Sequence, residues 1–395
     1  MNGLATLLLL LAASSEPSMV QAAASATDGQ DSQRVTRAPR FEDWLVPQPV
    51  APRAKLPEPE ETPLTEFEGL PVTVYEQRLA DGSLLSRRYE AHLPLADRPG
   101  DHGPEWRWHP NGVLATARTW NRGVQVGYAV EWHENGEVKS QRKYVADQVD
   151  GAALTFDNRG RVLKVQEWKL GKPDGGLWEW YPKPRRPKLE ETWVDGLQEG
   201  VARTWSPAGL LKLETHWKGG AKHGSWKAWH DNGNPRLVGH FENGAQQGTW
   251  DRWNPQGQNV SRQNWRDGVL HGVLTKWGPG GQKLVQESYT EGELDGQRIE
   301  WYPNGNKRVD AMFRAGVVDG KQSSWWPDGT PSAVIMHKDG RPHGPTTRWH
   351  ENGQKEVEGE RVEGLREGRW TYWKSDGTVD KTWSGVYKSD KKVAD

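Results

Sequence analysis

One unit of 24 residues, opened by a glycine, recurs through three quarters of the chain. A fixed period of this length indicates stacked structural units that form one elongated body, so a chain of 395 residues need not contain several domains. One residue is inserted between the fourth and fifth units. The opening glycines are Gly103, Gly127, Gly151, Gly175, Gly200, Gly224, Gly248, Gly272, Gly296, Gly320, Gly344 and Gly368.

Each unit carries an aromatic residue at position 5, counted from the opening glycine as position 0. This residue is tryptophan in every unit but one, where Phe156 replaces it. We interpret these tryptophans as the structural core of the repeat, because tryptophan buries a large apolar area in a chain with few other apolar residues. They are Trp108, Trp132, Trp180, Trp205, Trp229, Trp253, Trp277, Trp301, Trp325, Trp349 and Trp373.

Glycines at positions 9 and 20 divide the unit into two short strands. The first is often preceded by Asn or Asp, as in Asn232-Gly233, and this pair is a strong hairpin signal whose two central residues accept positive φ. Position 17 is often aromatic, as at Phe241. So many glycines, without a 3.6-residue period, argue against helices. The sequence predicts an all-β fold: an elongated single-layer antiparallel sheet of about 12 stacked 24-residue β-hairpin repeats.

Positions 5, 13 and 17 are all odd, and on this parity we expect their side chains to share one buried face. Four further tryptophans then point away from that face and are candidate partner-binding residues: Trp226, Trp250 and Trp370 at position 2, and Trp326 at position 6. Exposed aromatic side chains often mark a binding surface for protein or sugar. The alternative is that strand twist, an overlying terminal arm or mutual packing buries them.

Composition restricts the chemistry that the chain can perform. It has no cysteine, which excludes disulfides, thiolate metal sites and the lipid anchor of bacterial lipoproteins. Basic and acidic residues number 52 and 53, so no basic excess suggests nucleic acid as a partner. Histidines recur before the opening glycine and at position 6, too far apart along a strand to share a metal. No catalytic, cofactor-binding or metal-binding motif is present, and we predict a protein that is not an enzyme and has no cofactor.

The N-terminal quarter is organised differently. An apolar run at residues 4–13, followed by small residues, predicts a signal peptide over residues 1–26 that is too short to span a bilayer. The alternative is an apolar leader without that role. We further expect a Pro-rich linker (27–70), a degenerate capping hairpin (71–102), the repeat array (103–387) and a charged, frayed tail (388–395). We predict no transmembrane segment in the mature chain, and a periplasmic or secreted location.

The array resembles the MORN repeat. The resemblance rests on the aromatic-x-x-Gly-x-x-x-Gly pattern, as in residues 241–248 and 217–224, and covers about residues 103–386. It is closest to the bacterial variant often described as an antitoxin component of toxin–antitoxin systems. The resemblance implies a twisted single-layer sheet of hairpins used for contact with proteins or lipids and not for catalysis. Most units lack the Tyr-Glu-Gly-x-Trp core of the eukaryotic form, which argues against phosphoinositide binding.

These observations favour a non-enzymatic scaffold in the bacterial cell envelope that binds a protein partner along the sheet. One alternative is binding of carbohydrate or cell wall through surface tryptophans. The other is an antitoxin that neutralises a toxin by direct binding.

Overall fold

The computed structural model of the protein describes residues 63–91 and 100–395. The predicted signal peptide and nearly all of the predicted linker lie outside these ranges. The described residues form an all-β fold, as predicted, in which 31 strands make one open antiparallel sheet.

The first ten strands are β1 (Glu66–Phe67), β2 (Leu70–Arg78), β3 (Leu84–Ala91), β4 (Gly100–Asp101), β5 (Gly103–Trp108), β6 (Leu114–Asn121), β7 (Val124–Trp132), β8 (Val138–Val145), β9 (Gln148–Val149) and β10 (Gly151–Phe156). The middle strands are β11 (Val162–Lys169), β12 (Lys172–Tyr181), β13 (Arg186–Val194), β14 (Leu197–Trp205), β15 (Leu211–Lys218), β16 (Ala221–Trp229), β17 (Pro235–Glu242), β18 (Ala245–Trp253), β19 (Asn259–Arg266), β20 (Val269–Leu270) and β21 (Gly272–Trp277). The last strands are β22 (Lys283–Thr290), β23 (Glu293–Trp301), β24 (Lys307–Arg314), β25 (Val317–Trp325), β26 (Pro331–Lys338), β27 (Arg341–Trp349), β28 (Lys355–Val362), β29 (Leu365–Tyr372), β30 (Gly385–Lys388) and β31 (Lys391–Ala394).

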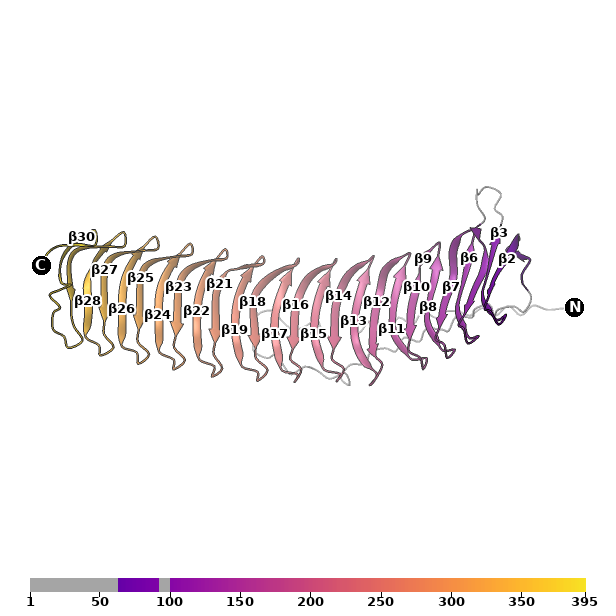
Figure 1. Ribbon diagram of the computed structural model, residues 1–395, viewed down its shortest axis with the longest axis horizontal. Coiled ribbons are helices and arrows are strands. Elements are labelled where there is room, and N and C mark those ends of the chain that lie inside the picture. The colour runs from indigo at the N-terminus through magenta and orange to yellow at the C-terminus, as the bar shows by residue number, and fades with distance from the viewer. Residues whose placement is uncertain (1–62, 92–99) are drawn as a thin grey trace, which may run out of the picture. The chain divides into compact units, whose positions relative to one another are not determined.

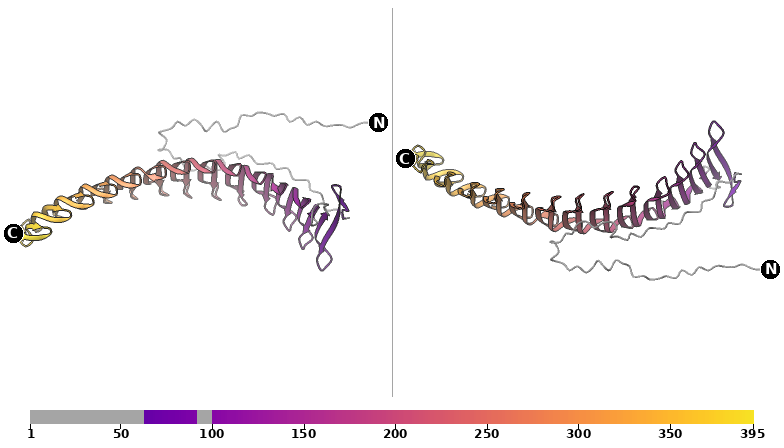
Figure 2. Two further views of the ribbon diagram at one scale, coloured as in Figure 1. Left: turned by 90° about the horizontal axis from the view of Figure 1, so that it is seen from above. Right: turned by 90° about the horizontal axis from the view of Figure 1, so that it is seen from below.

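The strands follow one another in chain order across the sheet (Figure 1). Each long strand pairs antiparallel with the strand before it and the strand after it, as β16 does with β15 and β17. Seen from above and below, the described strands form a single layer (Figure 2). Each 24-residue unit thus contributes one hairpin to a continuous meander.

The two turns of a unit differ in conformation. In the Asn232-Gly233 turn only Gly233 has positive φ, at 83°, and the amide of His230 bonds to the carbonyl of Asn234 at 2.8 Å. In the second turn both central residues have positive φ, 48° at Asn243 and 86° at Gly244. The expectation that both residues of an Asn-Gly pair take positive φ is therefore wrong, because this loop is longer than two residues. The primed two-residue turn lies at positions 19 and 20 instead.

The sheet register corrects the predicted arrangement of faces. Residues directly opposite one another on neighbouring strands share a face. Position 4 lies opposite position 13, as Arg252 does opposite Ser261, and position 0 lies opposite position 17, as Gly248 does opposite Trp265. Even positions of the first strand therefore share a face with odd positions of the second. The expectation that positions 5, 13 and 17 share a face is wrong, because the turn reverses the parity and a bulge follows position 4.

We call the face that carries positions 1, 3, 5, 11, 14 and 16 the tryptophan face. Trp205, Leu211 and Trp229 pack there into one buried cluster, with exposed fractions of 2%, 1% and 5%. In the C-terminal half the tryptophans are partly exposed, and lysines cover some rings: Lys283 Nζ lies 5.8 Å from the ring centre of Trp301. The predicted core tryptophans thus form one row, although a single layer buries few of them fully.

The N-terminal end of the sheet is closed by β1, β2 and β3. Tyr89 and Trp106 are each 1% exposed, and Leu64 packs against them. The Tyr89 hydroxyl also accepts a hydrogen bond from the amide of Leu64 at 3.1 Å. The ordered cap therefore begins within the segment expected to be linker, before residue 71.

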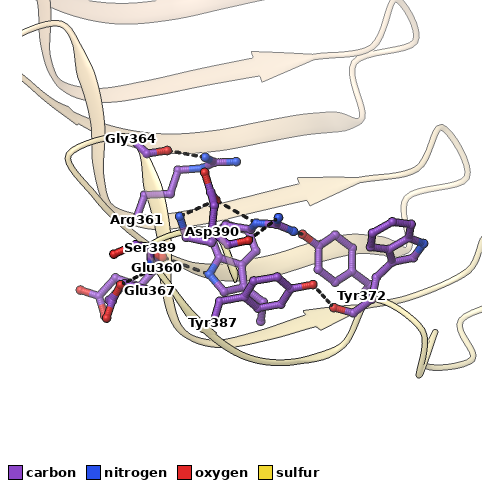
Figure 3. A network of polar contacts seen from close by, with 11 residues as sticks. Glu360, Arg361, Gly364, Glu367, Tyr372, Tyr387, Ser389 and Asp390 are labelled. Atoms are coloured by element: carbon purple, nitrogen blue, oxygen red, sulfur yellow. Dashed lines mark hydrogen bonds and ion pairs between the residues drawn. The ribbon is translucent and has the colours of Figure 1, made fainter. Parts of the chain in front are cut away.

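The C-terminal end differs from the expectation of a frayed tail (Figure 3). Residues 391–394 form β31, which pairs with β30 through a turn at Ser389 and Asp390. Asp390 Oδ1 accepts hydrogen bonds from the amide of Arg366 at 2.8 Å and from its Nε at 3.0 Å. These hydrogen bonds, first that of the backbone amide, hold the pKa of Asp390 below its usual range. Trp383, which precedes β30, lies outside any strand and is 57% exposed.

Candidate binding surface

We call the opposite face, with positions 2, 4, 13, 15 and 17, the groove face. Its most regular feature is a row of aromatic side chains at position 17, each paired across the hairpin with the opening glycine of its own unit. All members are partly exposed except Phe241, which is 9% exposed. The row comprises Trp120, Tyr144, Trp168, Trp193 (at position 18, after the inserted residue), Trp217, Phe241, Trp265, Tyr289 and Phe313.

Two of the candidate tryptophans meet on this face. The ring centre of Phe241 lies 5.3 Å from that of Trp226 and 5.0 Å from that of Trp250, both edge to face. Lys222 Nζ lies 4.6 Å from the ring centre of Trp226 and 5.0 Å from that of Phe241. The structure therefore brings Trp226 and Trp250 into one aromatic cluster through Phe241, whose position in the repeat predicts the opposite face.

Two of the candidate tryptophans are not exposed. Trp250 is 4% exposed and Trp370 is 1% exposed. Each indole lies on a glycine of the preceding strand: a Cβ built on Gly239 would come 2.2 Å from Trp250, and one on Gly359 would come 2.2 Å from Trp370. This close packing corrects the expectation that both side chains point away from the core. Trp226 lies opposite Thr215 instead and stays partly exposed.

A signal for this burial was present in the sequence. Gly239 and Gly359 stand at position 15, where most units have a larger residue, and each is followed in the next unit by a tryptophan at position 2. A glycine in the interior of a strand often marks a close approach by another group.

The fourth candidate, Trp326, has a structural partner. Its Nε1 donates a hydrogen bond of 3.3 Å to the backbone carbonyl of Trp349, at position 5 of the next unit. Residues at position 6 make this same contact in several units, so Trp326 fills a place in a ladder between neighbouring hairpins. The other donors are His109, His133, Tyr181, His230, Tyr302 and His350.

The histidines that precede the opening glycine also support turns. The Nδ1 of His223 accepts a hydrogen bond of 3.4 Å from the amide of Asn243, which has positive φ. His271 and His343 make the equivalent contact with Glu291 and Glu363. Within residues 63–91 and 100–395, no group of three or more His, Asp or Glu is arranged to hold a metal ion.

Two adjoining hollows open on the N-terminal part of the groove face. The larger, of ≈ 560 Å³, is lined by Arg88, Asp101, Glu105, Arg107, Arg118 and Trp120 among others. The smaller, of ≈ 220 Å³, is lined by Glu131, Arg142 and Tyr144 and shares Thr116 and Arg118 with the first. These arginines are not apparent from the sequence, because nothing in the period distinguishes Arg118 and Arg142 from other polar residues at position 15.

The charges near the larger hollow centre on Glu105, which is 4% exposed. Its Oε1 accepts a hydrogen bond from Arg107 Nε at 2.8 Å, and its Oε2 accepts one from Trp120 Nε1 at 2.9 Å. Arg118 Nε lies farther from Oε2, at 3.5 Å. The carboxylate is thus satisfied mainly by Arg107 and Trp120.

In the C-terminal half of the groove face, arginine and glutamate side chains form a network of close ion pairs. Glu300 pairs with both Arg298 and Arg308, and Arg298 also lies 3.2 Å from Glu287. Burial, and then the hydrogen bond to Glu287, raise the pKa of Tyr289 in the aromatic row. Its phenol therefore stays protonated and donates to Glu287 Oε2 at 3.0 Å.

Residues 222–243 match the family model described as MORN repeat variant. The match covers about one unit, the one that contains Trp226 and Phe241, and supports the MORN-repeat resemblance. No curated protein matches the chain.

Two solved structures are similar over most of the chain. The crystal structure of TcdB2-TccC3 is 12% identical, with 80% of this chain and 21% of that chain covered and a TM-score of 0.17. That of TcdB2-TccC3-TEV is 11% identical, with 78% and 20% covered and a TM-score of 0.15. The chain spans about a fifth of the length of these proteins. Similarity this low supports no argument about function.

No helix in the described parts of the chain is long and apolar enough to cross a membrane.

Proposed function

We propose that the protein is a non-enzymatic repeat scaffold that binds a protein partner along its groove face. The observation that carries this proposal is the aromatic row at position 17, which is partly exposed through nearly all of nine consecutive units. Partly exposed aromatic rings interleaved with polar and charged side chains are typical of binding surfaces.

The opposite face is less suited to this role. Its tryptophans pack against one another, as Trp205 and Trp229 do through Leu211, or lie under lysines, as Trp301 does under Lys283. Removing those side chains would disturb the array itself. On the groove face most rings of the aromatic row are partly exposed, and the hollows at its N-terminal end add shape to it.

We place this scaffold in the bacterial cell envelope. The support is the apolar run at residues 4–13 followed by small residues, which is typical of a signal peptide. Sequencing the N-terminus of the mature protein from the native organism tests this part: a start near residue 27 supports export, and a start at Met1 contradicts it.

Two alternative functions, carbohydrate binding and an antitoxin role, would give different experimental results. Binding of carbohydrate would use Trp226, which alone among the three tryptophans at position 2 remains partly exposed. An antitoxin role would follow from the MORN variant resemblance and would require a cytosolic location, so a processed N-terminus would exclude it.

Affinity purification of the tagged full chain from the native organism tests the binding surface. We expect one protein to co-purify with the wild type and to be lost when Trp226→Ala and Trp168→Ala are combined, because both rings lie on the groove face. Trp383→Ala is the matched control, since Trp383 is 57% exposed and lies outside any strand. Retention of the protein by the double variant would contradict the proposal, whereas capture of polysaccharide in place of protein would favour the carbohydrate function. Unchanged circular dichroism of the variants shows that the array is still folded.

A further inference from the structure

The two hollows at the N-terminal end of the groove face contain arginines that the protein's own acidic groups do not fully neutralise. The hollows are lined by four arginines and three carboxylates. The arginines are Arg88, Arg107, Arg118 and Arg142, and the carboxylates are Asp101, Glu105 and Glu131. Arg107 bonds to Glu105 at 2.8 Å, and Arg88 lies 2.8 Å from Glu90, outside the hollows, and 3.2 Å from Asp101. Glu131 faces Lys139 at 3.9 Å.

Of the four arginines, Arg118 and Arg142 lack a carboxylate within 3.2 Å. Arg118 Nε lies 3.5 Å from Glu105 Oε2, the same oxygen that accepts the hydrogen bond from Trp120. No acidic side chain in the described part of the chain pairs with Arg142, which is exposed. In the C-terminal half of the face, by contrast, Arg298 pairs with two carboxylates. Arg118 and Arg142 are thus the least compensated of the guanidiniums that line the two hollows.

These two arginines are equivalent positions of neighbouring units. Both stand at position 15, two residues before the aromatic row at Trp120 and Tyr144. Two strands separate them, and strands lie about 4.8 Å apart, so equivalent side chains recur about every 9.6 Å along the face. A bound peptide that runs across the strands on this face would therefore meet Arg118 and Trp120 in one repeat, and Arg142 and Tyr144 in the next repeat.

A polyproline II chain has nearly the same period. It has three residues per turn and rises about 3.1 Å per residue, so every third side chain points the same way at about 9.3 Å. A β-strand does not meet this condition, because residues three apart in a strand point to opposite sides. Proline-rich segments in this conformation dock on grooves lined by aromatic side chains.

We propose that the groove face binds an extended polyproline II segment of its partner, three residues per repeat, with acidic side chains at every third position seated in the two N-terminal hollows. The inference rests on the proposed function, and it specifies the chemistry and conformation of the protein partner. Arg118 and Arg142 pair with two successive acidic side chains of the segment. The prolines between these side chains lie on the rings of Trp120, Tyr144 and the following members of the row.

The test measures binding of synthetic peptides to the full chain by fluorescence anisotropy at low salt. The probe is a labelled peptide of about six Glu-Pro-Pro triplets, long enough to follow about six repeats. The same length of Lys-Pro-Pro reverses the charge, and Glu-Gly-Gly keeps the charge but lacks the polyproline II preference. We expect Glu-Pro-Pro to bind at least about tenfold more tightly than either control, with an affinity that falls as salt is added.

Variants assign the binding to the hollows. Arg118→Gln combined with Arg142→Gln should weaken Glu-Pro-Pro binding about tenfold, the effect of losing two partly exposed ion pairs. The matched control is Arg159→Gln with Arg369→Gln, which removes the same charge from exposed arginines of a turn and of the tryptophan face. This control should change the affinity less than about twofold.

Three outcomes would overturn the inference: equal binding of Glu-Pro-Pro and Lys-Pro-Pro, equal binding of Glu-Pro-Pro and Glu-Gly-Gly, or an equal loss in the two arginine double variants. Failure of all probes, with the native partner still captured through Trp226 and Trp168, would refute this inference and leave the proposed function standing. Peptide binding without any dependence of partner capture on those two tryptophans would refute the proposed function instead.

Discussion

The indole of Trp250 lies on the backbone of Gly239 in the neighbouring strand, so closely that a Cβ at Gly239 would come 2.2 Å from Trp250 Cδ2. Gly239 does not have positive φ, so the close approach of the indole, and not the backbone conformation, requires glycine here. Trp370 lies on Gly359 in the same way, two residues from the end of β29. An aromatic ring that covers a glycine across a strand pair fixes the register of the two strands.

This relationship predicts the outcome of a double-mutant cycle. Gly239→Ala should destabilise the array by about 1–3 kcal/mol, the cost of forcing an extra methyl group into packed space. The same substitution should cost much less when Trp250 is already alanine, because the clashing ring is gone. Chemical denaturation of the wild type, both single variants and the double variant gives the coupling free energy. Additive effects would show that the indole does not cover Gly239.

A second prediction concerns the row of tryptophans at position 5. Trp229 is 5% exposed and packs with Trp205 and Leu211, so Trp229→Ala should cost about 3–5 kcal/mol of local stability. The control is Trp383→Ala, whose side chain is 57% exposed and which should change stability by less than about 0.5 kcal/mol. The measurement is the midpoint of denaturation followed by tryptophan fluorescence. Equal shifts for the two variants would mean that position 5 is not part of the core.

The sequence predicted the architecture because its period is set by local chemistry. The glycines at positions 9 and 20 have positive φ in nearly every unit, as at Gly233 and Gly244, and a chain with two such turns every 24 residues must fold as successive hairpins. The sequence also indicated the row of tryptophans such as Trp229, since each unit repeats the same environment.

The assignment of faces could not be read from parity alone. Whether Trp253 shares a face with Ser261 depends on the length of the turn and on the bulge after Arg252, and a shift of one residue moves every side chain to the other face. The burial of Trp250 depends on which residue the register places across from it. The hollows at Arg118 and Arg142 depend on the side-chain pairs formed across strands, which a single sequence does not specify.

A third prediction follows from Asp157, at position 6 of its unit. Its Oδ1 accepts hydrogen bonds from the amides of Arg159 and Arg161 at 3.0 Å each, and its Oδ2 accepts one from Arg161 Nε at 2.8 Å. The pKa of Asp157 is lowered to about 2, first by the hydrogen bond from the Arg161 side chain. An unfolded aspartate has a pKa of about 3.9, so the ionised group stabilises the fold above about pH 4.

This stabilisation should disappear as the pH falls from about 4 through about 2, because the folded state then gains the proton that the unfolded state has already bound. Asp157→Asn removes the titrating group. We therefore expect the difference in stability between wild type and variant to be constant above about pH 4 and to shrink below it. Denaturation midpoints from pH 2 to 7 provide the measurement, and a difference that stays constant down to pH 2 would contradict the role of Arg161.

The last prediction concerns the contacts that join neighbouring hairpins through position 6. The hydroxyl of Tyr302 donates a hydrogen bond of 3.0 Å to the carbonyl of Trp325 in the next unit. Tyr302→Phe keeps the ring and removes only the donor, so it should cost about 0.5–1.5 kcal/mol. Tyr144→Phe is the control, because in the described part of the chain the partly exposed Tyr144 hydroxyl has no hydrogen-bond partner. Amide hydrogen exchange should locate the effect at β24 and β25, where the two units meet. A loss spread evenly over the array, or an equal loss in both variants, would show that this hydroxyl does not stabilise the junction between hairpins.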